Sequence, residues 1–94
     1  MNTEKIIADN ISLHTREWFL LKTAEECNEL SAAIMQYVTK DGSSMAILAE
    51  IADVEICIEL LSTIMGRTDI ESYKRGKWEK IDRKNKELMQ EIKD

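Results

Sequence analysis

The absence of proline is the feature that most restricts how this chain can fold. No proline interrupts its 94 residues, and glycine occurs only at positions 42, 66 and 76. Proline and glycine are the residues that oppose helix formation most strongly, whereas Ala, Leu, Ile, Glu and Lys, in which this chain is rich, are compatible with it. The sequence therefore predicts an all-α fold built from long helices.

The few interruptions of the helix-forming sequence mark the boundaries between the predicted helices. A short leading helix is expected over residues 4–13 and a long helix over residues 15–39. The long helix ends at the turn that begins with Lys40, where Gly42 is the predicted C-cap.

A second long helix is expected over residues 45–65, and it stops at Gly66. The segment Thr68-Asp69-Ile70-Glu71 then has the spacing of a capping box. It predicts that a last, highly charged helix opens there and continues to about residue 92.

The chain has no repeat, low-complexity tract or interdomain linker, so residues 1–94 are interpreted as a single domain. The two long helices are expected to form an antiparallel hairpin flanked by helices at each end. A domain of this size has a modest core of its own. We therefore expect a four-helix-bundle core that is completed by dimerisation.

Charge and hydropathy restrict the partners and the location. The formal net charge of -5 disfavours binding to a nucleic acid polymer. No segment approaches the ~20 apolar residues of a membrane span, so no membrane partner is expected and a cytoplasmic location is the default. Cys27 and Cys57 are too isolated to suggest a zinc site or a disulfide scaffold.

Two pairs of acidic residues have the spacing that places both side chains on one face of a helix. Glu26 and Glu29 are three residues apart, as are Glu50 and Asp53, so each pair shares one helix face. On a helical wheel, Glu50 and Asp53 fall on the same arc as Ile56, which predicts that both carboxylates are buried.

Two buried carboxylates require compensation. Removing an unpaired carboxylate from water costs several kcal/mol, and two at ~4 Å repel each other by about 4 kcal/mol at an effective dielectric of 20. A ligand set made only of oxygen suits Mg²⁺, with Mn²⁺ as a possible substitute, rather than zinc.

Other interpretations of the acids remain open. The acids of the first long helix could be a solvated face, and Glu50 and Asp53 could be salt-bridge partners of Lys22, Arg16 or Lys77. A ferritin-type di-metal bundle would need Glu-x-x-His motifs, and the sequence contains none. A non-catalytic helical interaction module with a structural cation site is the main alternative to an enzyme.

The segment from Glu25 to Glu29, followed after a spacer by Glu50-Ile51-Ala52-Asp53, resembles the EExxE…ExxD signature of MazG-like nucleoside triphosphate pyrophosphatases, in particular their short, single-domain bacterial and phage members. The resemblance covers about residues 15 to 85. It implies that Glu26, Glu29, Glu50 and Asp53 are magnesium ligands and that Glu25 orients or activates water.

The same resemblance implies an all-α dimer, or a dimer of dimers, that hydrolyses a nucleoside triphosphate to the monophosphate and pyrophosphate. Lys80-Ile81-Asp82-Arg83 resembles the KxxR stretch that follows the acidic helices in short relatives. Lys80 and Arg83 are therefore candidate phosphate contacts. Lys77 is a third candidate, because it shares an arc of the last helix with Ile70, Ile81 and Leu88, the stripe that is expected to pack inward. Trp18, about two turns before the acids, is a candidate base contact, although core packing is the alternative role for its ring.

Overall fold

The computed structural model describes residues 1–93, and these residues form helices without any strand. The helices are α1 (Thr3–Leu13), α2 (Arg16–Thr39), α3 (Ser44–Met65) and α4 (Arg67–Lys93). The prediction of an all-α chain is confirmed, and each predicted helix is present within a few residues of its expected bounds.

Side-chain caps explain where the first three helices begin. The side-chain oxygens of Asn2 and Thr15 each accept a hydrogen bond of 3.1 Å from the backbone N–H three residues further on. The hydroxyl of Ser43 accepts one of 3.0 Å from the N–H two residues on. These acceptors satisfy amide groups that have no partner inside the helix, so each helix starts directly after its cap.

Gly66 separates α3 from α4, as predicted. Its φ angle of 125° lies in a region of backbone conformation that residues other than glycine rarely adopt. Its N–H donates to the carbonyl of Ser62 at 2.9 Å and its own carbonyl accepts from Ile70 at 3.3 Å. The predicted capping box is wrong, because α4 already begins at Arg67 and Thr68 lies inside its first turn.

Gly42 does not cap α2, which corrects a second prediction. Lys40 is the C-cap, with an extended backbone (φ -139°, ψ 170°). Gly42 is needed for another reason: a Cβ at this position would lie 2.7 Å from the backbone nitrogen of Tyr37. The turn between α2 and α3 therefore folds back so closely on the end of α2 that only glycine fits.

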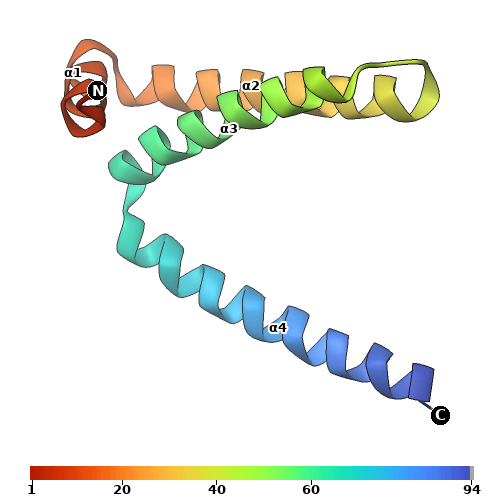
Figure 1. Ribbon diagram of the computed structural model, residues 1–94. Helices are drawn as coiled ribbons and strands as arrows, with labels where there is room; N and C mark the ends of the chain where they lie inside the picture. The colour runs from red at the N-terminus through yellow and green to blue at the C-terminus, as the bar shows by residue number, and fades with distance from the viewer. Residues whose placement is uncertain (94) are drawn as a thin grey trace.

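The arrangement of the helices is open rather than bundled. Helices α2 and α3 pack side by side as an antiparallel hairpin, α1 lies across its open end, and α4 extends away from α3 like the second arm of a V (Figure 1). Within the described chain, α4 contacts α3 and makes no contact with α2. The radius of gyration is 17.5 Å, compared with about 13 Å for a compact domain of about 100 residues.

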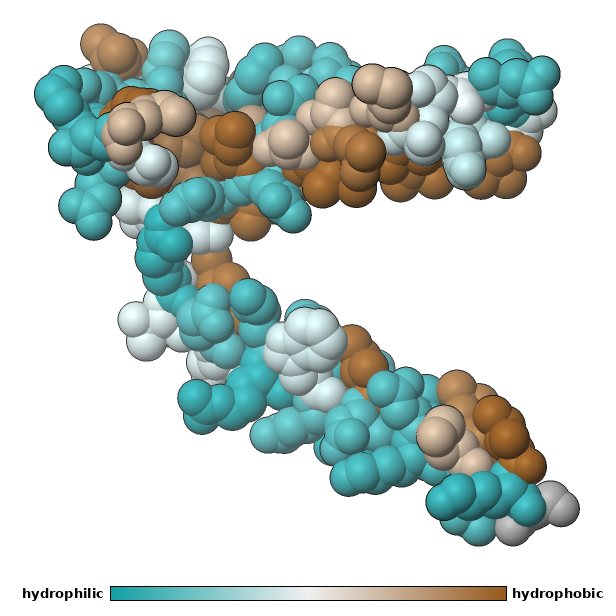
Figure 2. All heavy atoms as spheres, viewed as in Figure 1, coloured by the Kyte–Doolittle hydropathy of each residue, from teal (hydrophilic) through white to brown (hydrophobic). Residues whose placement is uncertain are grey.

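Few apolar side chains are buried in this open form. Phe19, at 2% exposure, is the only buried hydrophobic residue among residues 1–93. Trp18 and His14 stack at 3.7 Å between ring centroids, and Phe19 meets both rings edge-on. Figure 2 shows hydrophobic residues along the hairpin and along the side of α4 that faces it across the open V.

Candidate metal centre

The structure brings together all five acids that the sequence predicts as a site. Glu25, Glu26 and Glu29 come from the middle of α2, while Glu50 and Asp53 come from the first half of α3. They form two groups, Glu25 with Glu26 and Glu29, and Glu26 with Glu50 and Asp53, in which the carboxylate oxygens lie within 4.8 Å of one another. Glu26 belongs to both groups and joins them.

Burial is distributed differently from the prediction. Glu26 is the most buried acid, at 7% exposure, whereas Glu50 is half-buried and Asp53 is exposed. The prediction of burial is therefore wrong for Asp53. Asp53 is exposed because the apolar arc of α3 is only partly covered in a single chain. Ile56, on the same arc, is 59% exposed.

The burial of Glu26 follows the helical spacing of the buried residues of α2. The buried residues of α2 are Phe19, Thr23 and Glu26, which are four and three positions apart. This spacing defines one face of a helix, and that face packs against α3. Glu26 lies on the helix face that begins with Phe19, so the same periodicity places it against α3.

Two carboxylate oxygens in the site are buried without compensation. Among the described residues, Oε2 of Glu26 and Oε2 of Glu50 are the buried side-chain oxygens that have no hydrogen-bond partner. An unpaired, desolvated carboxylate is costly unless a cation or a proton neutralises it. The orphaned oxygens and the all-oxygen donor set therefore fit a hard cation such as Mg²⁺.

Lys22 is the basic side chain that pairs with this cluster. Its ammonium lies 3.2 Å from Oε1 of Glu26 and 3.7 Å from Oε1 of Glu25. The hydrogen bond to Glu26, followed by the charge of Glu25, raises the pKa of Lys22 above its ordinary value. The ion pairs leave the buried Oε2 of Glu26 without a partner.

The salt-bridge interpretation of Glu50 and Asp53 is wrong. Within residues 1–93 no ion pair joins either acid to a basic side chain, and Lys22 instead pairs with the acids of α2. The guanidinium of Arg16 donates to the sulfur of Met65 at 3.0 Å.

Repulsion from neighbouring acids raises the pKa of Glu29. The charge of Glu26, then burial, then the charge of Glu50 raise the pKa of Glu29 above its ordinary value. Burial, followed by the charge of Glu26, likewise raises the pKa of the Cys57 thiol. The negative field centred on Glu26 therefore reaches both helices of the hairpin.

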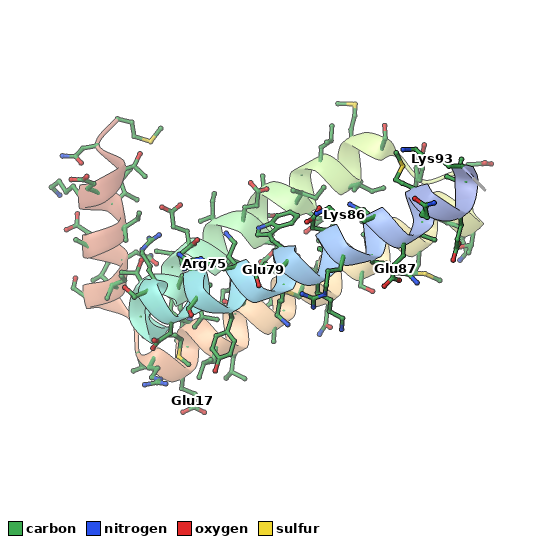
Figure 3. All side chains as sticks on the ribbon, turned by 90° about the horizontal axis from the view of Figure 1, so that it is seen from below. Glu17, Arg75, Glu79, Lys86, Glu87 and Lys93 are labelled. Atoms are coloured by element: carbon green, nitrogen blue, oxygen red, sulfur yellow. The ribbon has the colours of Figure 1, made fainter. Side chains whose placement is uncertain are left out.

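The basic residues of α4 lie apart from the acids in this structure. Lys77, Lys80 and Arg83 are exposed on a helix that leaves the hairpin (Figure 1). Figure 3 shows charged side chains such as Arg75 and Lys86 along the same helix. The expected inward stripe of α4 is exposed as well, with Ile81 at 48%. Within one chain, these candidates do not join the acidic cluster.

Trp18, the candidate base contact, is 38% exposed at the start of α2. One face of its ring is covered by His14, and Phe19 packs against it edge-on. The structure therefore assigns Trp18 a packing contact at the corner between α1 and α2.

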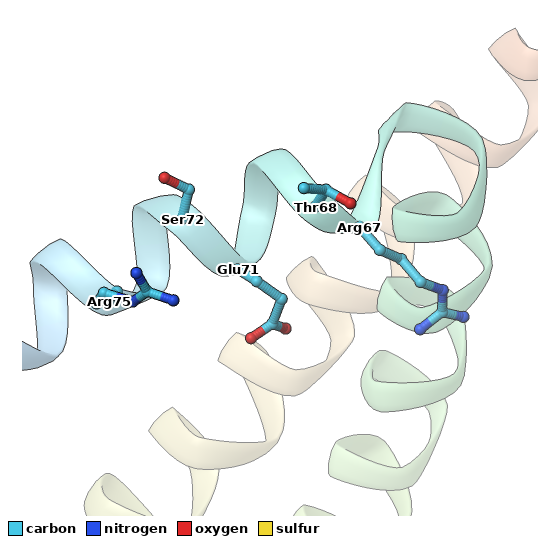
Figure 4. Close-up of a pocket in the computed structure, with 5 residues that line it drawn as sticks. All are labelled: Arg67, Thr68, Glu71, Ser72 and Arg75. Atoms are coloured by element: carbon cyan, nitrogen blue, oxygen red, sulfur yellow. The ribbon is translucent and has the colours of Figure 1, made fainter.

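A shallow surface pocket lies on the first turns of α4 (Figure 4), lined by Arg67, Thr68, Glu71, Ser72 and Arg75. The guanidinium of Arg67 donates to the Thr63 hydroxyl at 2.7 Å and lies 3.7 Å from a Glu59 carboxylate oxygen. Arg67 therefore ties α4 to the end of α3, and the pocket includes none of the predicted site residues.

Within residues 1–93 no helix combines the length and the apolar character needed to cross a lipid bilayer. No protein-family model, no curated protein and no solved structure matches this chain.

Proposed function

We propose that this chain is a magnesium-dependent nucleoside triphosphate pyrophosphatase. It hydrolyses an NTP or dNTP to the nucleoside monophosphate and pyrophosphate, by attack of water at the α–β phosphate linkage. The choice of reaction rests on the resemblance of the two acidic motifs to MazG-like pyrophosphatases. The cytoplasm, where nucleotides are abundant, is the proposed location.

The observation that carries the proposal is the convergence of Glu26, Glu50 and Asp53 from two helices. Each of the three offers a carboxylate oxygen within 4.8 Å of the others. One oxygen of Glu26 and one of Glu50 are buried without a hydrogen-bond partner. Acids on a solvated helix surface keep their carboxylate oxygens in contact with water, and buried polar atoms normally have a hydrogen-bond partner. A cation between the helices supplies the missing partner.

The roles of the residues follow from their positions. Glu26, Glu50 and Asp53 would hold Mg²⁺ together with Glu29, whose carboxylate lies beside Glu26. When bound, Mg²⁺ neutralises charge on the phosphates and acidifies water. Glu25 is exposed at the edge of the cluster, where its carboxylate can orient the attacking water and accept its proton.

We further propose that the working form is a homodimer or a dimer of dimers. The accessible surface of the chain is 7838 Å², whereas a compact monomer of this mass exposes about 5,600 Å². The excess of about 2,200 Å² exceeds the ~800 Å² that each partner buries in a standard interface. A second copy could therefore cover the apolar sides of the V and bring Lys77, Lys80 and Arg83 of one copy to the phosphates bound by another.

A non-catalytic helical interaction module is the second candidate, and the exposed apolar surface of the hairpin and α4 favours it. In that case the acids would hold a structural cation. This candidate predicts metal binding without hydrolysis of any triphosphate.

The deciding experiment is a pyrophosphate-release screen over all NTPs and dNTPs, with Mg²⁺ and with Mn²⁺. We expect release from at least one substrate and its loss in Glu50→Gln. Glu55→Gln is the matched control, because Glu55 is exposed on the same helix and outside both acidic groups. Absence of release by the folded protein from every substrate would contradict the enzymatic proposal.

A further inference from the structure

The two carboxylate oxygens of Glu26 have different surroundings. Oε1 faces the Lys22 ammonium at 3.2 Å, while Oε2 is buried and has no partner. Glu26 is itself 7% exposed, so its carboxylate is held between the lysine on one side and the Glu50–Asp53 pair on the other. One carboxylate is therefore shared between an internal cation and the candidate metal position.

We propose that Lys22 is a tethered counter-cation that competes with the divalent metal for Glu26. In the metal-free protein its ammonium offsets the repulsion among the acids and keeps the cluster assembled. When the metal binds, the ammonium is displaced from Glu26. This inference rests on the proposed metal site.

Charge and geometry oppose the simultaneous binding of Lys22 and a divalent metal to Glu26. A dication within the Glu26, Glu50 and Asp53 group lies close to any ammonium that contacts Glu26, and the two positive charges repel each other. Metal binding also favours a Glu26 carboxylate whose charge is fully available. Each cation therefore weakens the binding of the other, and this linkage is reciprocal.

The lysine side chain is able to leave. It is 38% exposed and attached through a flexible four-carbon stem, and an ammonium is readily hydrated. Glu25, at 3.7 Å from the ammonium and 58% exposed, offers a second position at the edge of the cluster. Displacement from Glu26 therefore does not require α2 or α3 to move.

The competition has a functional consequence for the proposed enzyme. The site is kept assembled without metal, so no folding step has to precede metal binding. The same ion pair raises the free metal concentration that is needed to fill the site. A purely structural lysine would have the opposite effect, since its loss would disorder the ligands and weaken metal binding.

The test compares Lys22→Met, which keeps the aliphatic stem, with Lys22→Arg, which keeps the charge. Mg²⁺ affinity is measured by calorimetry, and the melting temperature is measured in EDTA. Lys74→Met is the matched control, because Lys74 forms an equivalent ion pair of 3.4 Å with Glu71 on α4, away from the site.

We expect Lys22→Met to bind Mg²⁺ about tenfold more tightly, equivalent to about 1.4 kcal/mol, and to melt at a lower temperature in EDTA. Lys22→Arg and Lys74→Met should keep the wild-type affinity. If Lys22→Met does not fold, Lys22→Gln provides the same comparison. Unchanged or weaker Mg²⁺ binding after loss of the charge would overturn the inference while leaving the metal site intact. No Mg²⁺ binding by the wild-type protein would instead remove the metal site itself, and the inference with it.

Discussion

Glu26 of α2 and Glu50 of α3 each keep one carboxylate oxygen, Oε2, buried and without a hydrogen-bond partner. The two residues belong to the same acidic group, in which the ligand oxygens lie within 4.8 Å. The contact between the long helices therefore contains an unfavourable element in the metal-free protein. It follows that the stability of the hairpin and the occupancy of the site are coupled.

Replacing Glu50 with glutamine should stabilise the metal-free protein. The change removes one of two facing charges and supplies amide donors that can reach Glu26. We expect the free energy of unfolding in EDTA to rise by about 1–3 kcal/mol, the usual cost of an unsatisfied buried polar group. Urea denaturation measures it, with Glu55→Gln as a control that should change it by less than about 0.5 kcal/mol. A loss of stability in Glu50→Gln would mean that Glu50 has a favourable partner.

Metal should stabilise the wild-type protein, and Asp53→Asn should reduce that effect. A ligand that binds only the native state at 100 times its Kd adds about 2.7 kcal/mol. Because asparagine lacks the charge of aspartate, the same Mg²⁺ concentration should raise the melting temperature of the variant less. Asp69→Asn, an exposed change in the first turn of α4, serves as the control. An equal thermal shift in Asp53→Asn and wild type would exclude Asp53 as a ligand.

The sequence predicts the helices well because the responsible signals are local. The lack of proline permits long helices, and the stop at Gly66 acts within one turn. The clustering of Glu26 with Glu50 also follows from periodicity once the two helices are known to pack.

Two features could not be predicted in this way, because they depend on tertiary contacts. Asp53 is exposed rather than buried because its exposure depends on what covers α3, and a single chain leaves that side open. The position of Lys77 depends on the direction that α4 takes after Gly66. Periodicity shows only that Lys77 shares a stripe with Ile81, and it does not show what that stripe packs against.

The stability of the metal-free protein should vary with pH because the pKa of Glu29 is raised in the folded state. The charge of Glu26 holds the pKa of Glu29 above its ordinary value, so between the two values the native state binds more protons than the unfolded chain. This contribution therefore stabilises the fold as the pH falls through the raised pKa, and is complete below the ordinary one.

The measurement for Glu29 is the difference in melting temperature between Glu29→Gln and wild type in EDTA. The variant should be the more stable protein at neutral pH, and its advantage should shrink as the solution is acidified. With Mg²⁺ present, metal affinity should instead rise with pH, because the ligands must lose their protons. A difference between the two proteins that does not vary with pH would contradict the assignment.

The two cysteines should differ in reactivity. Burial, then the charge of Glu26, raises the pKa of the Cys57 thiol, so less of the reactive thiolate is present at a given pH. Cys27 is exposed on α2. We expect iodoacetamide to alkylate Cys27 several times faster, as followed by mass spectrometry, with Cys27→Ser and Cys57→Ser identifying each site. Equal rates would show that Cys57 is not shielded in solution.

The corner between α1 and α2 should be the most sensitive packing site of the chain. Phe19 is 2% exposed and meets the rings of Trp18 at 5.0 Å and His14 at 5.9 Å, both edge-on. Truncation of a buried phenylalanine to alanine costs about 3–5 kcal/mol, which is a large share of the 5–15 kcal/mol that stabilises a typical domain.

Phe19→Ala should therefore lower the urea midpoint strongly or prevent folding, and Phe19→Leu, which fills much of the same space, should retain a measurable transition. Leu13→Ala is the control, because Leu13 is 73% exposed at the end of α1. Since Phe19 and Glu26 lie on the same buried face of α2, loosening this corner should also weaken Mg²⁺ binding in Phe19→Leu. If Phe19→Ala lowered the free energy of unfolding by less than about 1 kcal/mol, Phe19 would not be a tightly packed core residue. The fold would then depend on contacts elsewhere.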